Sequence, residues 1–392
     1  MNIITDSFSS HITGKPYSGD GLTDGNVHEF INIASRQKIL PMCADVLMTY
    51  KGTSLSKQNT DAIRHMLMNS IYGDTIHSCD FLRVYTELLN AGLSPICVKG
   101  IVCKQLYPSP SLRASADEDL IIRPEELEKT IELLKKLGFV LHADGSDISL
   151  MNDSGLLLEL HPVLFRENDI ISRFNDLFGN IYDTSHTLEI DDVNFYVLPT
   201  DDNLLYLVLH AFSHFLTKGI GIRQLCDISL TIQKTNADVE YAFDKCRLVR
   251  ADGFFNACLL IGEKSFGLDL SPYDFINRDM DIEPLMEDIL TGGIYGGETE
   301  DRVHSAEITL RAYASSLDNK KNKLLSAVFL PYGKMRTKYS YVDGRPYLLP
   351  VAYGDRILGY LSKRHNVKST IDMGLSRRKM FEYYGIIGEK NE

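Results

Sequence analysis

The spacing of apolar positions changes twice along this chain, and each spacing predicts a different kind of structure. From about Asn26 to Ser70, and again from Asp74 to Asn90, apolar residues recur every three or four positions, as in amphipathic helices. The stretch before them, residues 1–24, is rich in Ser, Thr and Gly and is predicted to be an irregular lead-in. Residues 1–75 are therefore expected to form an N-terminal helical segment.

Between residues 76 and 200 the last of these helices is followed, after residue 92, by short apolar runs that replace the helical spacing. Two of them, Ile96–Val98 and Asp119–Ile122, predict buried strands, and Pro124 marks the start of a helix between strands. Turn residues at 153–155 and 191–192 predict two hairpins. This stretch is expected to be a small α/β core.

After residue 200 the helical spacing returns. It is clearest over four runs: Leu204–Leu216, Ile222–Gln233, Val239–Leu248 and Phe254–Phe266. A glycine-rich break is expected at Gly292–Gly297, an irregular region over Phe329–Pro350 and a final helix over Val351–Leu361. The predicted fold class is α+β: a small mixed sheet with flanking helices, N-terminal helices before it, and a mainly helical region over residues 201–392 after it.

Composition and hydropathy indicate the cellular compartment in which we expect this protein. The 392 residues are 44% hydrophobic and 24% charged, which is typical of a globular protein. No stretch approaches the roughly eighteen apolar residues of a membrane span, and the N-terminus lacks the pattern of a signal peptide. The seven cysteines form no CxxC pair, which suits a reducing compartment. We therefore expect a cytoplasmic protein without a membrane span.

Charge is distributed unevenly. The net charge is −12, yet residues 318–392 carry fifteen Lys or Arg against seven Asp or Glu. Such a basic tail is either a solvated face or a surface that helps to hold a polyanion. The acidic remainder favours a small-molecule or protein partner over a long nucleic acid.

The strongest chemical signal is Asp117-Glu118-Asp119 at the start of a predicted strand. Residues two apart on a strand point to the same face, so Asp117 and Asp119 would lie side by side with Glu118 turned away. Two such carboxylates repel each other unless a cation lies between them, and their oxygens suit Mg²⁺ or Mn²⁺. The pair therefore predicts a divalent-metal site, most commonly used for phosphate chemistry.

Two further segments could complete that site. Lys99-Gly100 follows a predicted strand and could seat a phosphate, or could be only a glycine turn with a surface lysine. Glu159 interrupts the apolar run 156–161, where an ionised side chain is costly unless it is paired or bound to metal. It could be the third acid, with His161 on the same face, or it could lie in solvent on an edge strand.

These motifs resemble those of the nucleotidyltransferase superfamily that includes DNA polymerase beta, and more narrowly those of a bacterial family of uncharacterised nucleotidyltransferases. The matching segments are Val98-Lys99-Gly100, Tyr107-Pro108, Leu112-Arg113, Asp117-x-Asp119-Leu120, Glu159-Leu160-His161, Leu209-His210-x3-His214, Arg223-x3-Asp227-Ile228, Leu330-Pro331 and Leu348-Leu349-Pro350. The resemblance implies Asp117, Asp119 and Glu159 as catalytic metal ligands. It implies nucleotide contacts from a second set: Lys99, Gly100, Arg113, His161, His210 and Arg223.

The chain departs from the superfamily pattern at two positions. Lys99-Gly100 stands where the superfamily usually has Gly-Ser, so the serine contact to the terminal phosphates is missing. Glu118 stands where such families favour an apolar residue between the aspartates. The second departure predicts either a wet opposite face of the strand or a lysine or arginine partner for Glu118.

Three other features have competing interpretations. Arg113 could clamp a phosphate bidentately or hold its loop through a salt bridge to an acid. His210 and His214 have the spacing of zinc ligands, but the glutamate of a zincin motif is absent, so a place in the core or along a cleft is favoured. Arg223 and Asp227 predict an ion pair along one helix face, or a role in the cleft.

The favoured function is that of a Mg²⁺- or Mn²⁺-dependent enzyme that transfers a nucleoside monophosphate from a nucleoside triphosphate to a hydroxyl acceptor. A nucleotide- or partner-binding module without turnover is the main alternative, motivated by the missing serine and by Glu118. A metal-dependent phosphohydrolase is the weaker one.

Overall fold

The computed structural model describes residues 2–113, 115, 117–142, 148–166, 168–292, 309–310, 312–317, 332, 335–336, 339–362 and 377–388. The chain divides into two compact units, one made of Met1–Ser213 with Ile220–Ile294 and the other of His214–Gly219 with Tyr295–Glu392. The three-part division made from sequence stays a prediction. None of the described helices has the length and hydropathy needed to cross a membrane.

The first unit begins with four helices: α1 (Asn2–Thr13), α2 (Val27–Arg36), α3 (Leu40–Thr49) and α4 (Lys57–Asn90). The expectation of an irregular lead-in over residues 1–24 is wrong for residues 2–13, where Ile4, Phe8 and Ile12 form a buried stripe along α1, and is confirmed for residues 14–24. Helix α4 also continues through the break expected between residues 70 and 74. Gly73 lies inside it with open space around its Cα, so only the modest helix cost of glycine opposes continuity.

The sheet is mixed and has the strand order β3-β4-β5-β2-β1-β7-β6. Its strands are β1 (Ile96–Val98), β2 (Asp117–Ile121), β3 (Val140–His142), β4 (Ile148–Met151), β5 (Leu157–His161), β6 (His186–Ile190) and β7 (Val193–Val197). Both expected hairpins are present, as β4–β5 and β6–β7. The α+β fold class predicted from sequence is confirmed.

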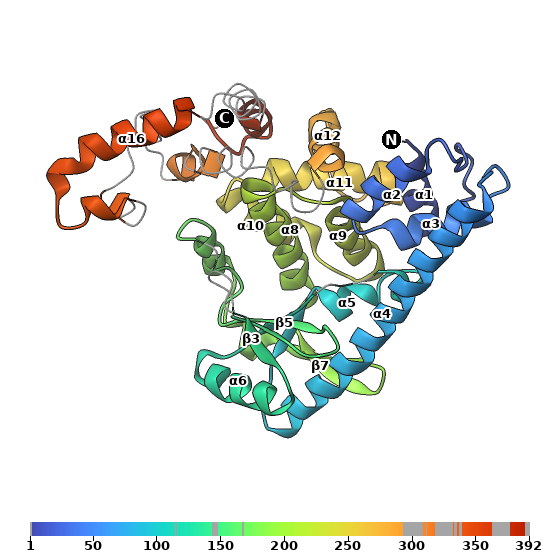
Figure 1. Ribbon diagram of the computed structural model, residues 1–392, viewed down its shortest axis with the longest axis horizontal. Coiled ribbons are helices and arrows are strands. Elements are labelled where there is room, and N and C mark those ends of the chain that lie inside the picture. The colour runs from blue at the N-terminus through green and yellow to red at the C-terminus, as the bar shows by residue number, and fades with distance from the viewer. Residues whose placement is uncertain are drawn as a thin grey trace. The chain divides into compact units, whose positions relative to one another are not determined.

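Short helical segments join the strands. They are α5 (Gly100–Lys104), the 3-10 turns η1 (Pro110–Leu112), η2 (Pro124–Glu126) and η3 (Ile171–Leu177), and helices α6 (Leu127–Lys136) and α7 (Ile181–Thr184). Helix α4 lies along the sheet as well as along the N-terminal helices (Figure 1).

One face of the sheet is apolar and the other carries the polar residues. Leu120, Leu158 and Leu160 are fully buried in a core that also contains Tyr85 and Phe195, whose rings stack with centroids 4.2 Å apart. Strand residues alternate between faces, so Asp119, Glu159 and His161 point away from this core. The apolar alternation of β2 and β5 thus decides which face the acids occupy.

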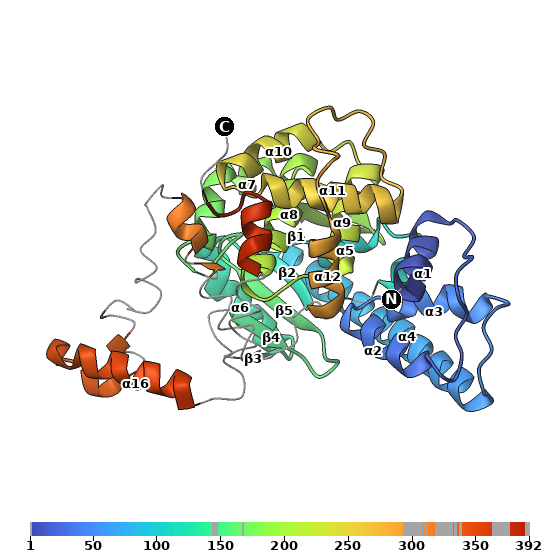
Figure 2. The ribbon, with the colours of Figure 1, turned by 90° about the horizontal axis from the view of Figure 1, so that it is seen from above.

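The helical region after residue 200 covers the polar face of the sheet. Its helices are α8 (Thr200–Thr217), α9 (Ile222–Lys234), α10 (Val239–Leu248), α11 (Asp252–Phe266) and α12 (Glu283–Gly292). Figure 2 shows α8 and α9 over β1 and β2. The four runs of helical spacing predicted here are confirmed as α8 to α11.

Described parts of the second unit include the 3-10 turns η4 (Ser340–Val342) and η5 (Pro346–Leu348) and helix α16 (Leu349–Ser362). A small cluster of Met335, Val342 and Ala352 is buried there. Helix α16 confirms the final helix expected over Val351–Leu361. The motif Leu330-Pro331, residues 293–297 of the glycine-rich break and most of residues 329–338 lie outside the described residues.

Candidate active site

The acidic residues of β2 and β5 meet because these strands are parallel neighbours. Asp119 lies directly beside Glu159 in the register. Residues two apart share a face of a strand, so Asp117 and His161 belong to the same face as this pair. Strand β1 pairs with the other side of β2 and ends one residue before Lys99. Three segments that are distant in sequence therefore meet at one place.

Asp119 is the centre of this cluster and is only 5% exposed. Its Oδ2 lies 2.8 Å from the Lys99 Nζ, and its Oδ1 lies 3.0 Å from the His161 Nε2. The same His161 nitrogen is 3.7 Å from the Glu159 Oε2. Both oxygens of the central carboxylate are thus engaged, one by an ammonium and one by an imidazole.

The environment of the cluster shifts the pKa values of its acids in opposite directions. Burial, together with the negative charges of Asp119 and Asp117, raises the pKa of Glu159 to about 7. Burial and the charge of Asp119 also raise the pKa of Asp117. Burial opposes ionisation of Asp119 too, but Lys99 and His161 hold the pKa of Asp119 well below its usual range. At neutral pH Asp119 is ionised, and Glu159 titrates near neutrality.

The donor set fits a divalent cation. The ligand atoms of Asp119, Glu159 and His161 all lie within 4.8 Å of one another, and no other part of the described chain gathers such a set. Asp117, expected from sequence as a ligand, is not in this group, and His161 is. Because burial and then neighbouring negative charge raise the pKa values of Asp117 and Glu159, a cation bound here would offset a repulsion that the structure already contains. Carboxylate oxygens with one imidazole suit Mn²⁺ as well as Mg²⁺.

Glu118 has a structural partner on the other side of β2. Its Oε2 accepts a hydrogen bond of 2.9 Å from the backbone N–H of Ile101. A Cβ added to Gly100, whose φ is +24°, would lie 1.8 Å from that oxygen, so any other residue here would strain the backbone and displace the Glu118 carboxylate. The partner of Glu118 is therefore the first turn of α5, which corrects the expectation of a wet face or a basic side chain. Gly100 is required by this approach, independently of any ligand.

Lys99 occupies a backbone conformation that favours glycine. Its φ of 55° and ψ of −121° place it in a region that side chains with a Cβ adopt only at a cost. The conformation directs the ammonium to Asp119 and to the Nε2 of His210 on α8, 3.1 Å away. Because an ammonium can only donate, His210 accepts this hydrogen bond through an unprotonated nitrogen.

Arg113 holds the loop that leads into β2. Its guanidinium donates to both carboxylate oxygens of Asp227 on α9, at 2.9 and 2.7 Å, and to the Gly100 carbonyl at 3.1 Å. Tyr107 donates a further hydrogen bond of 2.8 Å to Asp227. The side chain of Arg113 is buried, so the salt-bridge alternative describes it and the expected phosphate clamp is corrected. Asp227 likewise has its closest basic partner in Arg113, on another element, which corrects the expected pairing along one helix.

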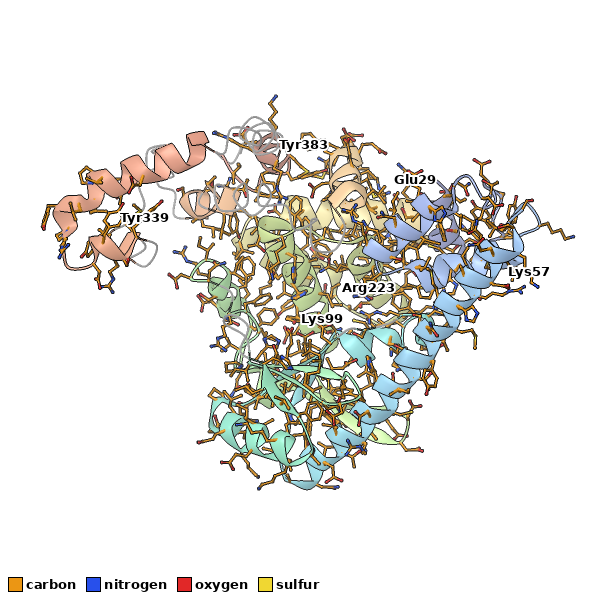
Figure 3. All side chains as sticks on the ribbon, in the orientation of Figure 1. Glu29, Lys57, Lys99, Arg223, Tyr339 and Tyr383 are labelled. Carbon is orange, nitrogen blue, oxygen red and sulfur yellow. The ribbon has the colours of Figure 1, made fainter. Side chains whose placement is uncertain are left out.

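The remaining candidates lie on the helical side of the site. Figure 3 shows the labelled Arg223 on α9 and the labelled Lys99 between the sheet and these helices. Burial and the charge of Arg113 lower the pKa of Arg223, while the carboxylate of Asp227 and, less strongly, that of Asp117 oppose that shift. His210 contacts Lys99, as described above. Neither His210 nor His214 belongs to the metal-capable group found among the described residues, so the zinc-type pair has no third ligand there.

Sequence reasoning missed two functional contacts. It did not predict the cap that Glu118 provides to α5, nor the link from Arg113 to Asp227 across 114 residues. A partial local signal existed for the first: Glu118 alternates with the two aspartates, so it had to lie on the opposite face of the strand. For the contact of Arg113 with Asp227 the sequence offered no signal beyond one basic and one acidic residue.

The family model described as an uncharacterised nucleotidyltransferase matches residues 23–267. None of the curated proteins matches the chain significantly. Among solved structures, one titled as the lincomycin-bound lincosamide antibiotic adenylyltransferase LnuA is similar. It shares 16% identity with a TM-score of 0.29, and the match covers 40% of this chain and 96% of the other.

Proposed function

Because the chain belongs to the uncharacterised nucleotidyltransferase family, we propose that it transfers a nucleoside monophosphate from a nucleoside triphosphate to a hydroxyl acceptor, in a reaction that depends on Mg²⁺ or Mn²⁺. One observation carries the proposal: Asp119, Glu159 and His161 form a metal-capable group with a lysine ammonium beside it. Carboxylates that can hold a cation, next to a point charge that can hold phosphate, suit phosphoryl chemistry.

In the proposed reaction the acceptor oxygen forms a bond to the α-phosphorus, and the bond from that phosphorus to the pyrophosphate oxygen breaks. Glu159 takes the proton of the acceptor hydroxyl as the general base. Lys99 binds phosphate oxygens through its ammonium. Asp119, Glu159 and His161, with Asp117 beside them, would hold the cation, which supplies neutralisation of phosphate charge when bound.

The acceptor is expected to be a small molecule or a protein. The chain carries a net charge of −12, which opposes close approach of a long polyanion. We therefore propose a nucleoside triphosphate and a hydroxyl-bearing small molecule or protein as the two substrates.

The test is calorimetric titration of each of the four ribonucleoside triphosphates, with Mg²⁺, into wild type and two single variants. Asp119→Asn should abolish metal-dependent binding of the preferred nucleotide. Asp192→Asn is the matched control, because it makes the same change in the β6–β7 turn, where asparagine tolerates the φ of 63°. A folded wild type that binds none of the four nucleotides would overturn the proposal.

A nucleotide-binding module without turnover is the second candidate. The observation that favours it is the Lys99–Asp119 pair, which places a resident cation on the central carboxylate. Binding without pyrophosphate release across a panel of hydroxyl acceptors would favour this candidate. Release of inorganic phosphate without any acceptor would instead indicate a phosphohydrolase.

A further inference from the structure

The contact between Lys99 and Asp119 affects how a divalent cation can bind in the site. The ammonium lies 2.8 Å from one oxygen of Asp119, and both side chains are largely shielded from water. An ion coordinated by that carboxylate would lie about 2.0–2.1 Å from its oxygen, close enough to repel the ammonium strongly at a shielded position. The lysine and a divalent cation therefore compete for Asp119.

The other oxygen of Asp119 offers no easy alternative. It faces His161, whose Nε2 is 3.0 Å away and must carry a proton to donate to an ionised carboxylate. An incoming cation would compete with this hydrogen bond on one oxygen and with the ammonium on the other. Without any other ligand, both oxygens of Asp119 are already engaged by side chains of the chain itself.

Lys99 has a second partner in the same position. Its Nζ is 3.1 Å from the His210 Nε2 on α8, so the ammonium has a neutral partner besides the carboxylate. Phosphate oxygens are strong acceptors for a lysine, and a triphosphate brings several negative charges. Phosphates that enter the site would therefore compete with Asp119 for the ammonium.

The backbone at Lys99 supports a functional role for this contact. A side chain is held at φ 55° and ψ −121°, where glycine would be relaxed. Such strain is retained when the side chain is needed at that place. The strain here directs a positive charge to the carboxylate that a metal would use.

We infer that the Lys99 ammonium is a resident counter-ion that keeps divalent cations off Asp119 until the phosphates of a nucleotide draw it away, so that metal and nucleotide bind cooperatively. The inference rests on the proposed function and adds the order in which the site is filled. By linkage, the nucleotide must raise metal affinity by the same factor as the metal raises nucleotide affinity.

The test measures binding of Mn²⁺ alone, by electron paramagnetic resonance, in wild type and three variants. Lys99→Met removes the ammonium and keeps the chain length, and it should bind Mn²⁺ roughly tenfold or more tightly than wild type, the size of effect one neighbouring charge has on a carboxylate. Lys99→Arg keeps the charge and should bind Mn²⁺ weakly, as wild type does. Lys129→Met is the matched control for net charge, because Lys129 is exposed and donates to the Ala91 carbonyl instead.

The same titrations are repeated with α,β-methylene ATP, which cannot be cleaved at the α-phosphate. Wild type should then bind Mn²⁺ tightly, and the gain caused by the nucleotide should be much smaller in Lys99→Met. Equal or weaker Mn²⁺ binding by folded Lys99→Met, with nucleotide-dependent Mn²⁺ binding intact in wild type, overturns this inference and leaves the proposed function standing. If wild type binds neither Mn²⁺ nor the analogue under any of these conditions, the proposed function fails as well.

Discussion

Lys99 is the residue at which fold and function make opposite demands. Glycine at this position would relieve the backbone strain of its positive φ, whereas the lysine ammonium is the partner of Asp119. We expect Lys99→Gly to be more stable than Lys99→Ala by about 1 kcal/mol, the reverse of the usual order, because both lose the ammonium and only alanine keeps the strain. Urea unfolding of the two variants measures the difference. A Lys99→Ala variant at least as stable as Lys99→Gly would show that the backbone at this position is not strained.

A second prediction concerns Glu118 and the dependence of stability on pH. Burial raises the pKa of Glu118 to about 7 from an ordinary value of 4.5. The folded state therefore holds a proton that the unfolded chain releases. Stability from this group is fully present below pH 4.5 and is lost as the pH rises through 7.

The matched variant is Glu118→Gln, which keeps an acceptor for the Ile101 N–H but does not titrate. Between pH 4 and pH 8 the free energy of unfolding of wild type should fall relative to that of the variant by on the order of 3 kcal/mol. Urea unfolding at both pH values, without metal, gives this double difference. A difference that does not change with pH would mean that the Glu118 carboxyl titrates normally in the folded protein.

At this scale the sequence predicted the chemistry of the site better than its contacts. The alternation within each strand was enough to put Asp117 with Asp119 and Glu159 with His161, because strand periodicity is a local property, whereas the pairing of β2 with β5 brings the two sets together. The salt bridge of Arg113 to Asp227 could not be predicted, since it depends on how α9 packs over the sheet. Local spacing instead favoured Arg223 as the partner of Asp227.

At the scale of elements, a buried ion pair joins α4 to α5. Lys104 Nζ lies 2.6 Å from an Asp74 carboxylate oxygen and 2.9 Å from the Ser78 hydroxyl, with both charged side chains nearly inaccessible. Asp74→Ala should cost about 3–5 kcal/mol in unfolding free energy, because it leaves the Lys104 charge buried without its partner. Chemical denaturation measures the loss.

The control for this pair is the double variant Asp74→Leu with Lys104→Met. It removes both charges and fills similar volume, so most of the stability lost in Asp74→Ala should return. If the double variant is as unstable as the single one, the pair matters through its packing and not through its charge.

The sequence was least accurate about the lengths of the helices. Helix α4 was expected in separate pieces because Gly73 and polar residues interrupt its apolar pattern, yet contacts with both the N-terminal helices and the sheet keep it continuous. Helix α1 was overlooked because Ser and Thr fill its polar face. Its buried stripe includes Phe8, which meets Phe266 edge to face at 5.5 Å. Tertiary contacts overrode weak helix propensity in both cases.

At the scale of the first unit, the sheet and the helical region that follows it are connected through one buried cluster. Arg113 precedes β2, Asp227 belongs to α9, and Tyr107 follows α5. This cluster ties the strand that carries Asp119 to the helices over the site. The sequence predicted the two kinds of structure separately, but not the contact that fixes one against the other, because such a contact depends on the packed arrangement of both.

Asp227→Ala tests that connection. It leaves the Arg113 guanidinium buried with the Gly100 carbonyl as its remaining partner in this cluster, so we expect a loss of about 3–5 kcal/mol in unfolding free energy. Tyr107→Phe is the mild control, since it removes one hydrogen bond to the same carboxylate and should cost about 1 kcal/mol.

The same variants test whether the cluster positions the site. Because Arg113 also holds the turn that carries Lys99, Asp227→Ala should weaken nucleotide binding even where the protein remains folded. Tyr107→Phe should leave nucleotide affinity within about threefold of wild type. Denaturation and nucleotide titration of the two variants check both effects. Loss of stability with unchanged nucleotide affinity in Asp227→Ala would show that the cluster supports the fold without positioning the site.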